Sequence, residues 1–242
     1  MHKPFLAMLN FFYPKTCVSC QRDIAFDSAR NLCDVCFNSI RLIDELCCVL
    51  CGAVLPDGGA HCFICKKYKR SFDLARSAVI FEGSIRQMIH ALKYKQGDFL
   101  ALELSFWLAH QWLKTPEFQD ADMVIPVPLH SRNLRERGYN QSELLARHFL
   151  RRLSKTNNPL PSLQTDILLR TQTTQSQMSL SREERLKNVQ NAFEVKNKSI
   201  LHQKTVLMID DVCTTAFTLD ACARTLKENG AKKILGLTLA RD

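Results

Sequence analysis

From about residue 71 onward, two hydrophobic patterns alternate along the chain. Short apolar runs bounded by polar residues are typical of buried parallel strands. Between these runs, apolar residues recur at the spacing of one helix face. The runs predict strands at 78–81, 123–127, 192–195, 206–209 and 234–239, and the spacing predicts helices at 84–94, 99–113, 142–153 and 219–227. The alternation predicts an α/β fold with a mainly parallel sheet flanked by helices.

Several residues mark the ends and the packing of these helices. Ser84 and Asn140, each followed three residues later by Gln or Glu, fit the capping pattern of a helix start. Gly230 is expected to end the helix before the last strand. Trp107 and Trp112 lie on the apolar stripe of their helix, and we expect both to be packing residues.

The first 70 residues lack this alternation and carry most of the cysteines. Four Cys-x-x-Cys pairs occur there: Cys17/Cys20, Cys33/Cys36, Cys48/Cys51 and Cys62/Cys65. One pair binds Zn²⁺ from a tight turn, and two pairs complete a tetrahedral site. The gaps favour two sequential sites, although a cross-braced pairing of alternate pairs also fits. Cys48, rather than Cys47, keeps the spacing, and Gly52 eases the turn after Cys51.

The cellular compartment decides how these cysteines are interpreted. Residues 1–14 lack a small-residue cleavage site, and no apolar run approaches the ~20 residues that span a bilayer. We therefore expect a cytoplasmic protein, in which paired cysteines are metal ligands rather than disulfides. Sites of four thiolates are closed, so we assign zinc a structural role. The expected domains are a double zinc ribbon over residues 1–70 and an α/β domain over residues 71–242.

The most informative stretch is the strand predicted at 206–209 with the turn that follows it. Two carboxylates, Asp210 and Asp211, come after the strand, and the hydroxyls of Thr214, Thr215 and Thr218 lead into the next helix. Ligands bind beyond the carboxyl ends of parallel strands, and a helix N-terminus attracts phosphate. The carboxylates suit sugar hydroxyls or a metal ion. We expect both to lie in a loop and face solvent.

This stretch resembles the phosphoribosyl pyrophosphate (PRPP) signature of type I phosphoribosyltransferases. The resemblance implies that Asp210 and Asp211 are catalytic residues that contact the ribose hydroxyls, with Mg²⁺ assisting the departure of pyrophosphate. The implied PRPP-binding residues are Asp210, Asp211, Val212, Cys213, Thr214, Thr215, Ala216, Phe217 and Thr218. The family usually has glycine where this chain has Ala216, and alanine adopts a positive φ poorly. This departure bears on phosphate affinity, and an ordinary strand–turn–helix is the alternative.

A basic turn follows the strand predicted at 123–127. Arg132, Arg135 and Arg137 place three guanidinium groups in a stretch of six residues beside a strand end. Arginine binds the oxygens of phosphate and pyrophosphate bidentately. We assign these arginines to the pyrophosphate side of the site, with a solvated basic turn as the alternative. His130 is the nearest candidate for a general base, although a turn histidine is more often a hydrogen-bonding residue.

Further motifs resemble the ComF family, bacterial phosphoribosyltransferase-like proteins associated with competence for DNA uptake, among which GntX-type proteins belong. The matching segments occur in the family's order and cover almost the whole chain. They are Lys93-Tyr94 with Gly97-Asp98, then Pro126-Val-Pro-Leu-His with Arg132, then Arg137-Gly-Tyr-Asn-Gln, and finally Arg170, Gln177, Leu180, Arg185, Asn188 and Phe193. The segment Thr171–Ser179 matches the flexible loop that covers PRPP in type I enzymes.

The resemblance implies a PRPP-binding protein that transfers phosphoribosyl to an unknown acceptor and serves natural transformation. The competing class is a non-catalytic adaptor for nucleic acid or protein, with a regulatory or vestigial PRPP pocket. A third class, a purely zinc-dependent DNA-binding factor, lacks a basic recognition helix.

Net charge bears on the partners. The chain carries a formal charge of +9, which suits an anionic partner such as single-stranded DNA. We place DNA contact on the basic linker Lys66, Lys67, Lys69 and Arg70, which we expect to lie outside the PRPP pocket, with Phe63 or Tyr68 available for base stacking. A solvated linker is the alternative. Proteins of the DNA-uptake machinery are the other implied partners.

Overall fold

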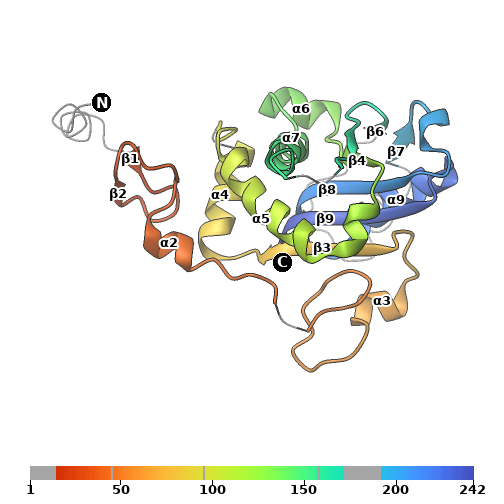
Figure 1. The fold of residues 1–242 in the computed structure, drawn as a ribbon, viewed down its shortest axis with the longest axis horizontal. Coiled ribbons are helices and arrows are strands. Elements are labelled where there is room, and N and C mark those ends of the chain that lie inside the picture. Colours follow the sequence, from red (N-terminus) through yellow and green to blue (C-terminus); the bar gives the residue numbers. More distant parts are fainter. Residues whose placement is uncertain (1–14, 45, 95, 157–158, 172–191) are drawn as a thin grey trace.

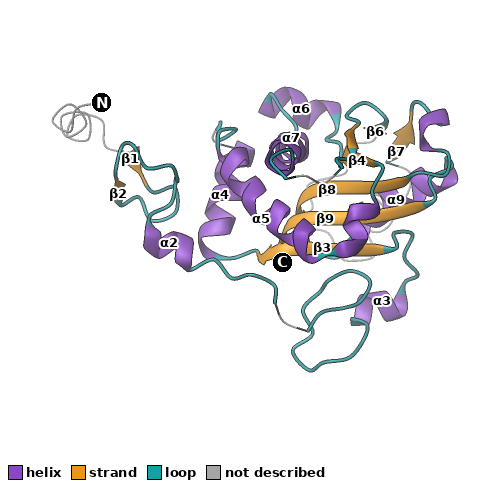
Figure 2. Cartoon of the chain, in the orientation of Figure 1, coloured by secondary structure: helices purple, strands orange, loops and turns teal. Residues whose placement is uncertain are grey.

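The computed structural model describes residues 15–44, 46–94, 96–156, 159–171 and 192–242 (Figures 1 and 2). Its central sheet contains β3 (Leu74–Ile80), β4 (Met123–Pro126), β5 (Ser162–Leu163), β8 (Thr205–Cys213) and β9 (Lys233–Arg241). The strand order is β3-β9-β8-β4-β5, and every pairing is parallel. The predicted parallel sheet is confirmed, and β8 extends beyond its apolar run to include both aspartates.

Four helices confirm the sequence pattern close to the predicted bounds: α4 (Gly83–Tyr94), α5 (Leu100–Lys114), α7 (Gln141–Leu153) and α9 (Phe217–Glu228). A 3₁₀ turn, η1 (Pro116–Asp120), follows α5. Gly230 has a φ of 102° just after α9, as its predicted stop role requires. Trp107 and Trp112 are buried, which confirms their packing role.

The two predicted helix starts differ in outcome. Asn140 caps α7 as predicted, because its side chain accepts the backbone N–H of Ser142 at 3.0 Å. The Glu143 carboxylate instead binds Arg147 at 2.7 Å. The predicted start of α4 is wrong: the helix begins at Gly83, and the buried Ser84 hydroxyl lies 3.4 Å from that of Ser39.

The alternating residues of β8 face two separate hydrophobic cores. Leu207 and Ile209 pack in the core formed with α4, α5 and α7. Val206 and Met208 pack in the core formed with α9. A small two-stranded antiparallel sheet, β6 (Leu168–Arg170) with β7 (Phe193–Val195), also packs in the α9 core, and the turn η2 (Ser199–Leu201) precedes β8. Both sheet faces are covered, as continuous apolar strands require.

The cysteine-rich region forms two lobes that pack in different cores. The first lobe contains β1 (Lys15–Thr16), β2 (Asp23–Ile24) and α2 (Asp34–Asn38), and it packs near α4 and α5 (Figure 1). The second lobe contains α3 (Phe63–Lys67) and lies below β3 in the same view, in the α9 core. Between them, Leu42 forms an antiparallel bridge with Val79 and covers part of the edge of β3. The domain division at residue 70 stays a prediction.

Two further expectations concern other parts of the chain. The covering loop predicted at Thr171–Ser179 lies outside the described residues, apart from Thr171. In the part of the chain that the structure describes, no helix combines the length and apolar character needed to cross a membrane.

Candidate functional site

The two aspartates lie within β8 and are buried, so the expectation that they sit in a loop and face solvent was wrong. Asp210 is 8% exposed and Asp211 is 3% exposed. The parallel ladder with β9 continues past them to Cys213, paired with Arg241. The apolar run ends at residue 209. The hydrophobic pattern therefore did not show that the pairing between β8 and β9 continues through the two charged residues.

A network of polar contacts holds the two carboxylates. The Ser142 hydroxyl, in the first turn of α7, donates to Asp210 Oδ1 at 2.8 Å. The backbone N–H of Asp211 donates to the same oxygen at 2.9 Å. The ammonium of Lys93, near the end of α4, lies 2.5 Å from Asp211 Oδ2. The site therefore unites α4, α7 and β8.

Burial and mutual charge set the ionisation of this cluster. Burial, followed by the neighbouring charge of Asp211, raises the pKa of Asp210 to about 7, although Ser142 and Lys93 oppose the rise. Burial alone lowers the pKa of Lys93, but the charges of Asp211 and Asp210 outweigh it and leave that pKa above the usual value. Two carboxylates beside one ammonium leave one negative charge uncompensated when all three are ionised, which suits a bound cation.

The segment after β8 forms a tight turn into α9. Ala216 adopts the left-handed conformation, with a φ of 60°, at the N-cap position of α9. A side chain strains this conformation, whereas glycine adopts it freely. The positive φ therefore explains why glycine is usual at this position. Thr214 is exposed, and Thr215 and Thr218 are half-buried. The hydroxyls thus remain accessible beside a helix N-terminus.

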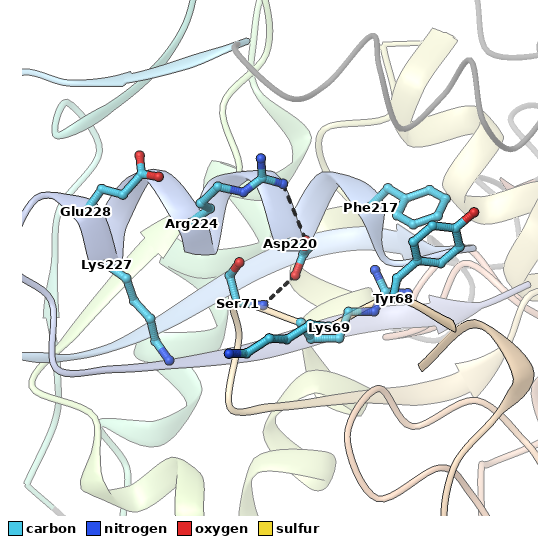
Figure 3. A pocket seen from close by; sticks show the side chains of 9 residues that line it. Tyr68, Lys69, Ser71, Phe217, Asp220, Arg224, Lys227 and Glu228 are labelled. Atoms are coloured by element: carbon cyan, nitrogen blue, oxygen red, sulfur yellow. Dashed lines mark hydrogen bonds and ion pairs between the residues drawn. The ribbon is translucent and has the colours of Figure 1, made fainter. Parts of the chain in front are cut away.

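The aromatic side chain of this turn belongs to the core. Phe217 is 4% exposed, and its ring meets that of Tyr68 edge to face at 5.6 Å (Figure 3). Phe217 is one of the proposed PRPP-binding residues, but its side chain packs in the core and supports the turn.

The three arginines of the basic segment lie on a helix that hydrophobic spacing did not predict. Helix α6 (Ser131–Arg137) occupies the expected turn; it is short, exposed and without apolar periodicity. Arg132 pairs with Glu136 at 2.9 Å. The side-chain nitrogen of His130 accepts the backbone N–H of Arg132, so this histidine caps α6 and has the hydrogen-bonding role that its setting favoured.

One arginine of α6 connects to the aspartate cluster. Arg137 donates to Gln141 and stacks on the Tyr94 ring at 5.3 Å. Tyr94 follows Lys93 in α4, and the Tyr139 hydroxyl donates to the Leu92 carbonyl at 2.5 Å. The C-terminal part of α6 therefore adjoins the end of α4 that supplies Lys93.

Three residues complete this region without having been assigned a role from sequence. Lys93 and Arg170 belong to the motifs that resemble the ComF family, but neither these motifs nor hydrophobic periodicity indicated what the two side chains contact. For Ser142, the sequence indicated only a position at the start of a helix. Arg170, in β6, stacks on Phe193 at 5.6 Å. Burial lowers the pKa of Arg170, and the charges of Cys222 and Asp210 oppose that effect.

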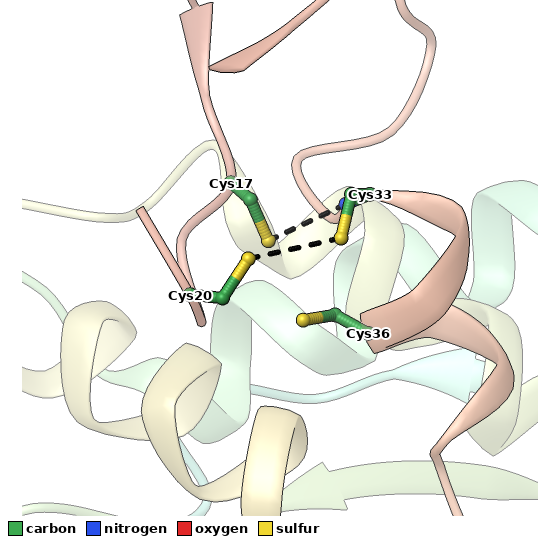
Figure 4. Close-up of side chains that lie close together, drawn as sticks. All are labelled: Cys17, Cys20, Cys33 and Cys36. Carbon is green, nitrogen blue, oxygen red and sulfur yellow. Dashed lines mark hydrogen bonds between the residues drawn. The ribbon is translucent and has the colours of Figure 1, made fainter. Parts of the chain in front are cut away.

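The eight cysteines form two separate clusters in the sequential pairing. Cys17, Cys20, Cys33 and Cys36 make one (Figure 4), and Cys48, Cys51, Cys62 and Cys65 make the other. In each cluster all ligand atoms lie within 4.8 Å of one another. The cross-braced alternative is therefore wrong, and Cys47 lies outside both clusters.

The sulfur separations in both clusters fit tetrahedral zinc. A Zn–S bond of about 2.3 Å places tetrahedral sulfurs about 3.8 Å apart. The Cys20 and Cys33 sulfurs are 3.8 Å apart, and those of Cys51 and Cys62 are 3.7 Å apart. All eleven cysteines are free thiols, so no disulfide competes. The two clusters support structural zinc.

We predict two zinc ions per chain, because each cluster supplies four thiolates and closes a tetrahedral site. Elemental analysis of protein purified without chelator is the measurement. One ion per chain would mean that one cluster is not a metal site. The Cys47→Ser variant is the control, since it should keep both ions.

The basic segment after the second cluster is not a simple linker outside the pocket. Lys66 and Lys67 end α3. Arg70 donates to the Thr215 carbonyl at 2.8 Å and stacks on Phe217 at 5.0 Å. The expectation that all four basic residues lie outside the proposed PRPP pocket was therefore wrong for Arg70, because Arg70 binds the turn at residues 214–218 that we call the PRPP turn.

A shallow pocket separates this segment from α9 (Figure 3). It is lined by Tyr68, Lys69, Arg70, Ser71, Phe217, Asp220, Arg224, Lys227 and Glu228. Asp220 accepts the Ser71 N–H at 2.6 Å and lies 3.6 Å from Arg224. Four of the lining residues are cations and two are acids, so the pocket favours anions.

Two family models match parts of the chain. The model described as a double zinc ribbon domain matches residues 8–68. The model described as a phosphoribosyl transferase domain matches residues 140–242, which include α7, β8 and α9.

Curated relatives align over nearly the whole chain. Competence protein F of Haemophilus influenzae is 28% identical over 97% of this chain and 100% of its own length. DNA utilization protein YhgH of Escherichia coli K12 is 27% identical over 94% of this chain and 97% of its own. Competence protein ComFC of Bacillus subtilis is 32% identical over 50% of this chain and 45% of its own.

Among solved structures, a hypoxanthine phosphoribosyl transferase of Trypanosoma cruzi aligns with 62% of this chain and 67% of its own. The identity is 12% and the TM-score is 0.33, a likeness too weak to support an assignment.

Proposed function

This chain belongs to the ComF/YhgH family, which joins a double zinc ribbon to a phosphoribosyltransferase domain, and from that premise we propose that it binds PRPP with Mg²⁺ beside β8 and transfers phosphoribosyl to an acceptor. The observation that carries the proposal is the buried cluster of Asp210, Asp211 and Lys93 directly before the turn into α9. A merely structural strand end has no need for two buried carboxylates with one negative charge in excess beside a helix N-terminus.

Each part of the ligand has a complementary group in this region. The contacts of Ser142 and of the Asp211 N–H both use Oδ1 of Asp210, which leaves Oδ2 for a ribose hydroxyl or a cation. Thr214–Thr218 offer hydroxyls at the positive end of α9 for the 5′-phosphate. Carboxylate oxygens also suit Mg²⁺, which would neutralise pyrophosphate charge when bound.

In the proposed reaction, a nucleophilic atom of the acceptor forms a bond to ribose C1 while the bond from C1 to the pyrophosphate oxygen breaks. The electron pair leaves with pyrophosphate, where negative charge accumulates. Arg132, Arg135 and Arg137 on α6 are the groups that we assign to this charge. The contact of Arg137 with Tyr94, next to Lys93, supports placing the pyrophosphate on that side.

Pyrophosphate release tests the transfer step. With PRPP, Mg²⁺ and pools of candidate acceptors, the wild-type chain should release pyrophosphate above the rate without acceptor, and Asp211→Asn should not. Saturable PRPP binding with no release in any pool would favour the adaptor, in which the pocket is regulatory.

The relatives' names, which refer to competence and to DNA utilization, support a second part of the proposal, a role in DNA uptake. We add to it a cytoplasmic location, with single-stranded DNA and proteins of the uptake machinery as partners. Lys69 lines the pocket together with Arg224 and Lys227, and the exposed Lys66 and Lys67 precede it by three and two residues. Exposed phenyl surface is present at Phe63, which is 71% exposed, whereas Tyr68 packs on Phe217. We therefore assign base stacking to Phe63.

We expect the triple change of Lys66, Lys67 and Lys69 to Ser to weaken single-stranded DNA binding and to flatten its salt dependence. Removing one lysine–phosphate pair should reduce the slope of log affinity against log salt by about 0.7. Arg70 is kept, because it binds the PRPP turn. Fluorescence anisotropy of a labelled oligonucleotide at several salt concentrations is the measurement.

The matched control changes Lys196, Lys198 and Lys232 to Ser, which removes the same charge from exposed positions not lining the pocket. This control should keep most of the salt slope, and both variants should keep PRPP affinity. An equal loss in both would mean that net charge, rather than this surface, attracts DNA.

A further inference from the structure

The second cysteine cluster contacts the proposed PRPP turn through two arginines. Arg241, at the end of β9, is 6% exposed. Its guanidinium donates to the Cys51 carbonyl at 2.9 Å and lies 3.0 Å from the Cys213 sulfur and 3.6 Å from the Cys51 sulfur. Cys51 is a zinc ligand, and Cys213 directly precedes Thr214.

Arg70 forms a second connection between the same two places. It follows Cys65 by five residues, donates to the Thr215 carbonyl and places its positive charge near Cys65. Two separate arginines thus join ligands of one cluster to opposite ends of the segment 213–215.

Charge explains why these arginines are stable in buried positions. Four thiolates around Zn²⁺ leave two negative charges, which Arg241 and Arg70 can balance. A buried guanidinium without a counter-charge is strongly destabilising. When the metal leaves, nothing holds the four sulfurs around one point beside Arg241, and the contact of Arg241 with Cys213 no longer has a fixed anchor.

The cluster is also fixed firmly to the sheet. The Leu50 carbonyl accepts the Ala75 N–H at 2.7 Å, and Arg76 donates to the Val49 carbonyl at 3.1 Å. A Cβ at Gly52 would lie 2.9 Å from the Ala75 carbonyl oxygen, so this turn approaches β3 as closely as glycine allows. Displacement of the cluster would therefore move its contacts with β3 and with the PRPP turn together.

The first cluster has different neighbours. Asn31 donates its backbone N–H to Glu103 on α5 at 2.8 Å, and the Phe37 ring lies 5.7 Å from that of Trp107. Within the described residues, its contacts lead to α4 and α5 rather than to the PRPP turn. The two zinc sites can therefore be compared within one chain, since the second contacts residues 213–215 and the first contacts α4 and α5.

We propose that zinc in the second cluster and PRPP bind with positive coupling, and that Arg241 and Arg70 are the positioning residues that transmit it. The inference rests on the proposed PRPP function and adds a regulation to it: loss of zinc from one site lowers the affinity of the pocket. Because coupling between two ligands is reciprocal, PRPP must in turn hold that zinc more tightly.

The first test uses matched ligand variants. Cys62 and Cys33 are half-buried and occupy equivalent N-cap positions, each with φ −69° and ψ 162°, before α3 and α2. Cys62→Ser should weaken PRPP binding about 10- to 100-fold, the usual effect of disturbing the surroundings of a metal site. Cys33→Ser should leave PRPP affinity near that of the wild type.

The second test begins with the wild-type chain, whose fold no substitution has disturbed. Zinc release to a chromogenic chelator is followed with and without PRPP and Mg²⁺. PRPP should slow the release of one of the two ions. Arg241→Met should lose that protection, whereas Arg241→Lys, which keeps the charge, should restore part of it.

The outcomes separate the coupling from the proposed function. No PRPP binding to the zinc-loaded wild type would overturn the proposed function itself. Normal PRPP binding with unchanged zinc release, equal protection of both ions, or equal weakening by Cys33→Ser and Cys62→Ser would overturn the coupling alone.

Discussion

Asp211→Asn is expected to abolish PRPP binding and to lower the free energy of unfolding by about 3–5 kcal/mol, because it leaves the Lys93 ammonium without its carboxylate partner in a mostly buried place. The two groups are 2.5 Å apart, and their side chains are 4% and 21% exposed. Breaking such a pair leaves the Lys93 ammonium without its direct contact, and the charge of Asp210, which also acts on Lys93, remains to balance it. Urea denaturation and PRPP titration are the measurements.

A double variant separates stability from binding. Adding Lys93→Met to Asp211→Asn removes the ammonium that has lost its direct partner, so much of the lost stability should return while PRPP binding stays absent. If the single Asp211→Asn variant is as stable as the wild type, the ion pair does not form, and the account of the site is wrong at its centre. The expectation from sequence, that solvent-facing aspartates could change without effect on stability, is overturned by their burial.

PRPP affinity is expected to rise steeply with pH up to about pH 7 and then to level off. The pKa of Asp210 is raised to about 7 by burial and by the charge of Asp211. Below that pH the carboxyl is protonated and cannot accept from ribose or hold a cation, so affinity should fall about tenfold per pH unit. Calorimetric titration between pH 5.5 and about 8.5 measures this, with the ionisation of PRPP itself determined by titrating the free ligand over the same pH range.

The same carboxyl gives a stability signature with a defined sign. Its pKa in the folded chain lies above the ordinary 3.8, so the native state holds the proton to higher pH than the unfolded chain does. Its stabilising contribution is therefore complete below about pH 4 and is lost as pH rises to about 7. Asp210→Asn should lack this loss and be more stable than the wild type at pH 8. An unchanged pH profile would place the buried charge elsewhere.

The strands and helices were predictable because hydrophobic period determines them. The run 206–209 predicted the central strand, and the helix at 99–113 appears as α5 within one residue at each end. Helix α6 was missed because residues 131–136 of this helix are exposed and Arg137 is half-buried, and an exposed helix carries no apolar stripe. Spacing likewise predicted the two zinc clusters, since a Cys-x-x-Cys pair is a local unit.

The contacts between distant segments were not predictable in the same way. Lys93 and Asp211 lie far apart in sequence, and so do Arg70 and Thr215. No periodicity relates such residues; only the order of strands in the sheet brings them together. Arg70 shows the consequence most plainly, because a run of basic residues indicates a solvated linker until the fold places one of them against the PRPP turn.

The most direct test of the PRPP site is calorimetric titration of PRPP with Mg²⁺ into the zinc-loaded chain at about pH 8, above the raised pKa of Asp210, in wild type, Asp211→Asn and Asp122→Asn. Asp122 is the matched control, since its carboxylate accepts the Thr205 N–H at 2.7 Å at the opposite end of β8. The account predicts one PRPP per chain for wild type and Asp122→Asn, and no saturable binding for Asp211→Asn. Absence of binding in wild type, or equal binding in Asp211→Asn, would contradict it.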